Sequence, residues 1–180
     1  MPGGAGFDVA RAGRHHPSTR SVCWVMDKDL RKELSERSLG ALGWFNLAMS
    51  NLAAADFLES EKAKELPFHD PIRGLYAHAW ELVLKACLRS QGLGVDEIRS
   101  KFGHDLRAIW DAVDRPRFPL LQLRDELDTF IDHLGFYHQN RLYAYPLAGS
   151  KRELELSFLR ATSSRLRMSR SDAASIFPAS

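Results

Sequence analysis

The chain has 180 residues, 44% of them hydrophobic, so it can bury the core of one compact domain but is too short for two ordinary domains. Its net charge of +2 is unevenly spread, with +2 on residues 1–20, −3 on residues 21–150 and +3 on residues 151–180. No apolar run reaches the roughly 18 residues that span a bilayer, the N-terminus lacks the apolar middle of a secretory signal, and the two cysteines form no CxxC pair. We therefore expect a cytoplasmic globular protein without membrane contact, cofactor or bound metal.

The first 29 residues mix Gly, Pro, Arg and His without a period, which predicts a flexible N-terminal extension. From about Leu39 apolar residues recur at three- and four-residue spacing, which is typical of a helix, and this helix is expected to reach about Lys64. Asp70 and Pro71 then indicate a new helix, with Asp70 as its N-cap and Pro71 in its first helical position.

This second long helix is expected to continue to Gly92, with a wide apolar stripe on one side. Glu81 precedes Lys85 by four residues, the favourable orientation for an ion pair on the helix surface. His78 shares the face of Glu81 and Lys85, and His104 from a neighbouring helix can approach it. Two interpretations stay open: a site that moves protons and binds phosphate, or a hydrogen-bond network that fixes the angle between two helices.

The rest of the chain is predicted to be helical as well. A short helix, "VDEIRSKF", ends at Gly103, and the next begins at once. A last long helix is expected from about Leu120 to Asn140, followed by an amphipathic helix over 151–167 and a basic tail. No segment alternates as a strand would, so the predicted fold is all-α, an antiparallel four- to five-helix bundle. Its predicted parts are a flexible extension (1–29), the bundle (30–150), and the amphipathic helix with the basic tail (151–180).

The adjacent pair His104–Asp105 follows Gly103 in the stretch "KFGHDL". Neighbouring side chains on a helix diverge by roughly 100°, so these two cannot face one another as a base and the group that orients it. We interpret the stretch as the end of one helix and the start of another, with Asp105 in the first turn of the second, where a carboxylate favours the helix dipole.

Residues 76–113 resemble the HEPN (higher eukaryotes and prokaryotes nucleotide-binding) domains. Members of that family pair an "H-x-x-E-L-x-L-K-A" helix with a "G-H-D-L" helix start, and the positions that match here are His78, Glu81, Leu82, Leu84, Lys85 and Ala86, then Gly103, His104, Asp105 and Leu106. The resemblance implies a four- or five-helix bundle that often dimerises, so a homodimer or a helical protein partner is expected. It also implies that RNA or a nucleotide is a candidate ligand.

Some HEPN proteins are metal-independent ribonucleases in which four to six residues separate an Arg from a following His, typically on the last core helix. Here that spacing joins Arg11 to His16, Arg73 to His78 and Arg99 to His104, whereas no His follows Arg141. The typical motif is therefore missing from the last core helix. The candidate catalytic residues are Arg73, His78 and His104, and Arg141 paired with His138 is a reversed variant of the motif.

A second candidate site is the stretch "FYHQNRLYAYP". Its tyrosines could stack on a base while the arginine pairs with a phosphate; in the other interpretation the tyrosines cover the end of the bundle. With Lys85, the candidate binding residues are Tyr137, His138, Arg141, Tyr143 and Tyr145. The leading hypothesis is a non-catalytic HEPN-like binding module, and the alternatives are a metal-independent ribonuclease and a structural subunit of a larger assembly.

Overall fold

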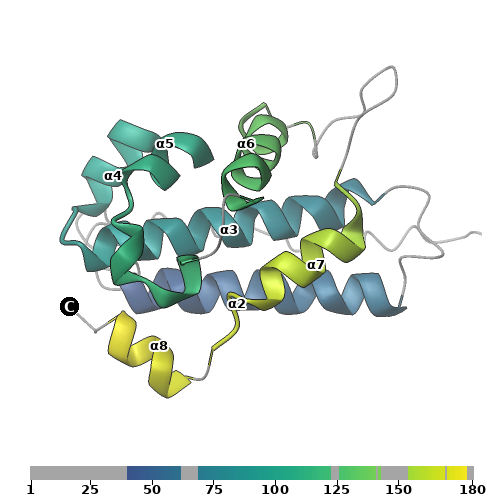
Figure 1. Cartoon of the computed structure of the whole chain (residues 1–180), viewed down its shortest axis with the longest axis horizontal. Helices are drawn as coiled ribbons and strands as arrows, with labels where there is room; N and C mark the ends of the chain where they lie inside the picture. The colour runs from purple at the N-terminus through teal and green to yellow at the C-terminus, as the bar shows by residue number, and fades with distance from the viewer. Residues whose placement is uncertain are drawn as a thin grey trace, which may run out of the picture.

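The computed structural model describes residues 40–61, 69–122, 126–140, 142, 154–168 and 170–177. The helices in these ranges are α2 (Ala41–Glu61), α3 (Asp70–Ser90), α4 (Val95–Phe102), α5 (Leu106–Ala112), α6 (Glu126–Gln139), α7 (Leu156–Ser164) and α8 (Arg170–Ile176), with two 3-10 turns, η1 (Arg115–Arg117) and η2 (Pro119–Leu121) (Figure 1). Across the described ranges there is no strand, which confirms the all-α class. None of the helices described is long and apolar enough to cross a membrane. The extension predicted at 1–29 lies outside the described residues.

Helices α2 and α3 form the centre of the molecule. They make more extensive contacts than any other pair of helices, and they lie side by side with the chain reversing direction between them (Figure 1). Every side chain of α3 from Tyr76 to Leu88 is buried except that of His78. A helix covered on nearly all sides is a core element rather than an amphipathic surface helix, so His78 marks a place where the cover over α3 is open.

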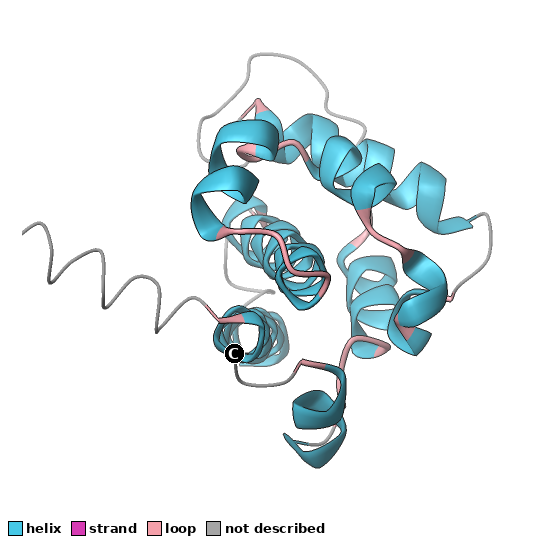
Figure 2. Cartoon of the chain, turned by 90° about the vertical axis from the view of Figure 1, so that its left-hand side faces the viewer, coloured by secondary structure: helices cyan, strands magenta, loops and turns pink. Residues whose placement is uncertain are grey.

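Helix α6 crosses α3 at a steep angle instead of running alongside it. Figure 1 shows α6 nearly end-on while α3 lies in the plane, and the turned view in Figure 2 looks along α2 and α3. A glycine allows α6 to approach α5 closely, because a Cβ added at Gly135 would lie 3.3 Å from Leu106 Cβ. Phe130 near the start of α6 packs on Trp80 of α3, and His138 near its end contacts Glu81. This arrangement differs from the uniformly antiparallel neighbours that short connections predicted.

The stretch around Gly103 has the role that the sequence predicted. Gly103 follows α4 with a φ of 54°, a left-handed conformation that few residues other than glycine adopt easily. Asp105 is the N-cap of α5, where its side chain accepts a hydrogen bond from the backbone N–H of Ala108 at 3.0 Å. Two helices are thus joined by a turn that points His104 away from Asp105.

The N-cap predicted for α3 was wrong. Helix α3 begins at Asp70, and His69 takes the N-cap position without a side-chain cap. The Asp70 carboxylate lies instead in the first turn, at the positive end of the helix dipole, 3.7 Å from the guanidinium of Arg73.

The chain after Pro119 departs most from the prediction. Residues 119–121 form the turn η2, and α6 is described only from Glu126. Helix α7 is shorter than the expected 151–167, and α8 occupies part of the predicted basic tail. The tail carries too few apolar residues to show a helical period, but Phe177 is fully buried, with its ring stacked 4.9 Å from Phe45.

We predict that Phe177→Ala will destabilise the protein by about 3–5 kcal/mol, because it removes a large buried side chain and leaves a cavity. Phe57→Ala is the matched control, since the Phe57 side chain is 64% exposed, and it should change the free energy of unfolding by less than about 0.5 kcal/mol. Urea unfolding of the full chain measures both. If Phe177→Ala and Phe57→Ala lower the free energy of unfolding equally, the C-terminal segment does not contribute to the core.

Candidate functional site

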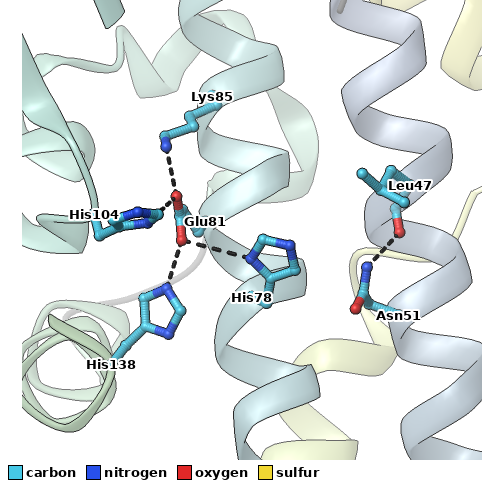
Figure 3. Close-up of polar contacts among 7 residues, drawn as sticks. All are labelled: Leu47, Asn51, His78, Glu81, Lys85, His104 and His138. Carbon is cyan, nitrogen blue, oxygen red and sulfur yellow. Dashed lines mark hydrogen bonds and ion pairs between the residues drawn. The ribbon is translucent and has the colours of Figure 1, made fainter. Parts of the chain in front are cut away.

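A buried carboxylate on α3, that of Glu81, is surrounded by four basic side chains (Figure 3). Glu81 is only 1% exposed. Its Oε1 atom lies 2.5 Å from Lys85 Nζ and 2.9 Å from His104 Nδ1. Its Oε2 atom lies 2.5 Å from His138 Nε2 and 3.6 Å from His78 Nδ1. We call these five residues the Glu81 cluster.

Three segments that are distant in sequence build this cluster. Helix α3 supplies His78, Glu81 and Lys85, whose spacing of three and four residues puts them on one helix face. The turn between α4 and α5 supplies His104, and the steep crossing of α6 supplies His138. The predicted approach of His104 to the face of Glu81 and Lys85 is therefore found in the structure.

The ion pair between Glu81 and Lys85 was predicted on the helix surface, and this was wrong: Lys85 is only 7% exposed. His104 and His138, from neighbouring segments, contact the Glu81 carboxylate and help to cover the ion pair. Burial alone would raise the pKa of the Glu81 carboxyl, but hydrogen bonds from His138, His78 and Lys85 outweigh burial and hold that pKa far below its usual range. Glu81 is therefore ionised at neutral pH.

The ionised carboxylate fixes the orientation of the histidine rings. A carboxylate only accepts hydrogen bonds, so the nitrogen that contacts it must donate: Nδ1–H in His104 and Nε2–H in His138. His104 therefore keeps Nε2, and His138 keeps Nδ1, for another partner. The exposed fractions of the side chains are 64% for His104, 43% for His78 and 16% for His138.

The rings stand close enough to act on one ligand. The ring centroids of His78 and His138 are 6.2 Å apart, and those of His104 and His138 are 6.1 Å apart. Oriented imidazoles can stack on a base, accept or donate a hydrogen bond, transfer a proton or bind a metal ion. His78 Nδ1, a carboxylate oxygen of Glu81 and His138 Nε2 also lie within 4.8 Å of one another, which is a possible set of metal ligands.

The other candidate residues lie elsewhere or outside the described part of the chain. Arg73 donates from Nε to the Leu154 carbonyl at 3.2 Å, next to the start of α7, and is not among the groups that contact Glu81. Tyr137 is only 7% exposed, and its ring centroid lies 5.1 Å from that of His133. This tyrosine packs in the core. Arg141, Tyr143 and Tyr145 fall outside the described residues.

Sequence reasoning assigned His138 to the tyrosine cluster and missed its place beside Glu81. The contact depends on the angle at which α6 crosses α3, and no pattern within one helix encodes that angle. The usable signal was chemical: a glutamate in the middle of an otherwise apolar helix needs several donors when buried, and His138 is one of the few donors on α6.

We predict that Glu81→Gln will lower the free energy of unfolding at pH 7 by about 3–5 kcal/mol, because it leaves the buried ammonium of Lys85 without its counter-charge. The folded-state pKa of Glu81 is lowered, so its ionised form stabilises the fold at pH values above the ordinary carboxyl value of 4.5, and this contribution declines as the pH falls below 4.5. The difference between the variant and the natural chain should therefore shrink in the same range.

Urea unfolding at pH 7 and at steps from pH 5 to pH 3 measures this difference. Glu97→Gln on the exposed surface of α4 is the matched control and should change stability by less than about 0.5 kcal/mol. A difference between Glu81→Gln and the natural chain that stays constant down to pH 3 would contradict the assignment.

The chain was compared with family models, with curated proteins and with solved structures, and none of the three comparisons found a match. The likeness of residues 76–113 to HEPN domains therefore rests on the matching residues themselves. Of those residues, His78, Glu81, Lys85 and His104 all belong to the Glu81 cluster.

Proposed function

We propose that the chain is a non-catalytic, HEPN-like binding module that contacts single-stranded RNA through the exposed edges of His78 and His104. The observation that carries this proposal is the arrangement of the Glu81 cluster: the buried carboxylate accepts a hydrogen bond from His104 Nδ1 at 2.9 Å and lies 3.6 Å from His78 Nδ1, while a large part of each side chain stays exposed. A ring whose rotamer is already fixed loses less conformational entropy when a ligand binds.

Two features of RNA fit this arrangement. A base that is not paired can stack on an imidazole ring. The Nε2 atom of His104 is left as a hydrogen-bond acceptor, because Nδ1 donates to Glu81. The ribose 2′-OH is a suitable donor to Nε2, and DNA lacks this group. The resemblance to HEPN domains supports the same ligand class, since it includes both histidines.

We predict that the full chain will bind single-stranded RNA more tightly than DNA of the same sequence, and that His104→Ala will weaken RNA binding by about 10-fold. This corresponds to about 1.4 kcal/mol, within the range of about 1–3 kcal/mol for one stacked base. Fluorescence anisotropy with a labelled oligonucleotide, in buffer containing EDTA, measures both. Gln139→Ala, on the exposed side of α6, is the control and should bind as the natural chain does.

Thermal unfolding of each variant is measured alongside binding. If His104→Ala leaves RNA affinity unchanged and only lowers the melting temperature, His104 has a structural role and the proposal fails. Equal affinity for RNA and DNA would remove the role of the 2′-OH.

Metal-independent RNA cleavage is the second candidate function. The observation that favours it is that the imidazole rings lie close enough to act on the same nucleotide. The ring centroids are 6.2 Å apart for His78 and His138, and 6.1 Å apart for His104 and His138. One imidazole could take the proton from a ribose 2′-OH, and another, in its protonated form, could give a proton to the leaving 5′-oxygen. One ring then gains a proton and the other loses one. General acid–base catalysis of this kind typically contributes about 10²–10⁴-fold.

Cleavage of a labelled RNA with excess protein, in EDTA, tests this candidate. We predict that any cleavage due to this site will fall by at least about 10²-fold in His78→Ala and will be unchanged in Gln139→Ala. Cleavage that survives His78→Ala would come from another site or from a contaminant. Binding without cleavage would leave the binding module as the function.

A further inference from the structure

The two oxygens of the Glu81 carboxylate have different surroundings. Oε1 is held by Lys85 and His104, whereas Oε2 faces the two remaining histidines, His78 and His138. Oε1 accepts hydrogen bonds from an ammonium and an imidazole. Oε2 accepts one from His138 and faces His78 at 3.6 Å, so it lies between two imidazole nitrogens that come from different helices.

The donor atoms on the Oε2 side are close enough to converge on a zinc ion. One ligand atom from each of His78, Glu81 and His138 lies within 4.8 Å of the others. In a tetrahedral zinc site with bonds of about 2.0–2.1 Å, the ligand atoms are about 3.3 Å apart. The observed separations from Oε2, 3.6 Å to His78 and 2.5 Å to His138, lie on either side of that value, so zinc binding requires His78 to move closer to Oε2 and His138 to move away from it.

We propose that His78, Glu81 and His138 bind a zinc ion, with Glu81 contributing Oε2 as a single ligand atom. Zinc replaces the hydrogen bond between His138 Nε2 and Oε2: the Nε2 proton is released to solvent, and the neutral ring carries its proton on Nδ1 instead. Two histidines and one carboxylate are a ligand set that zinc uses in proteins, and it leaves a fourth position for water or another molecule. The hydrogen bonds from Lys85 and His104 to Oε1 act as the outer support that orients a metal-binding carboxylate.

The charge of the site indicates which fourth ligand it favours. The zinc ion contributes +2, Lys85 +1 and Glu81 −1, so the occupied site has a charge of +2 with neutral histidines. His78 is 43% exposed, which leaves this side of the cluster open to solvent. An anion such as inorganic phosphate is therefore the preferred additional ligand. Zinc binding does not depend on the proposed RNA binding, which is measured without metal.

The test is isothermal titration of zinc into the full chain after treatment with EDTA. His15 and His16 are adjacent in the sequence and could bind zinc themselves, so the double variant His15→Ala/His16→Ala is the background for all measurements. In this background we expect one zinc ion per chain. His78→Ala and His138→Ala should each weaken zinc binding by more than about 100-fold, which exceeds the effect of losing an outer support.

His104→Ala separates this proposal from the proposed function. His104 contacts the carboxylate but is not in the ligand set, so its loss should weaken zinc binding by only about 10-fold, although it removes a predicted RNA contact. Gln139→Ala should leave zinc binding unchanged. A chain that binds zinc but not RNA overturns the proposed function alone, and a chain that binds RNA but not zinc overturns the zinc site alone.

His138 is the more buried of the two histidine ligands, so His138→Ala could unfold the chain. His78→Ala, at an exposed position, keeps the test decisive, with circular dichroism as the check of folding. Replacement of zinc by Co²⁺ gives a visible absorption spectrum that reports nitrogen and oxygen ligands in tetrahedral geometry. No zinc binding in the background variant, or binding that His78→Ala leaves unchanged, overturns the proposal.

Discussion

The structure depends on how the negative charge of Glu81 is satisfied inside the protein. Moving an isolated carboxylate out of water costs many kcal/mol, so a buried one must be paired and hydrogen-bonded. Lys85 provides the counter-charge from the same helix, but the remaining hydrogen bonds come from other segments. The α4–α5 turn and α6 must therefore both approach α3 at this point. The hydrogen bonds that one buried side chain requires thus fix how α3, the α4–α5 turn and α6 are arranged. Apolar packing alone would specify this arrangement less precisely.

The sequence predicted best what local chemistry determines. The bounds of α4, its end at Gly103 and the helix start at Asp105 follow from a positive φ and from a side chain that caps a helix, and both effects act within a few residues. The shared face of His78, Glu81 and Lys85 follows from helical spacing in the same way. Long-range packing was harder to predict. The steep crossing of α6, and hence the place of His138, results from contacts between helices that no single-helix pattern contains.

Two of the wrong predictions, for the Glu81–Lys85 pair and for the C-terminal segment, have a common cause. The Glu81–Lys85 pair looks like a surface pair because charged residues at that spacing usually face water, but here α3 is covered on almost every side. The basic segment after residue 164 looks soluble for the same reason, since its composition is polar. Three of its apolar residues, Leu166, Ala173 and Phe177, are nevertheless buried in the core. In both cases the overall polarity of a segment does not indicate which of its few side chains are buried, and those side chains decide its position.

The stacking of Phe177 on Phe45 also bears on the order in which the protein folds. These rings come from the last and the first described helical regions, and Phe118 packs on the far side of Phe177, with ring centroids 6.1 Å apart. Contacts between residues so distant in sequence form late, because a long loop must close before they can be made. On a ribosome, α2 would therefore remain without part of its apolar cover until Phe177 had been synthesised and had left the exit tunnel.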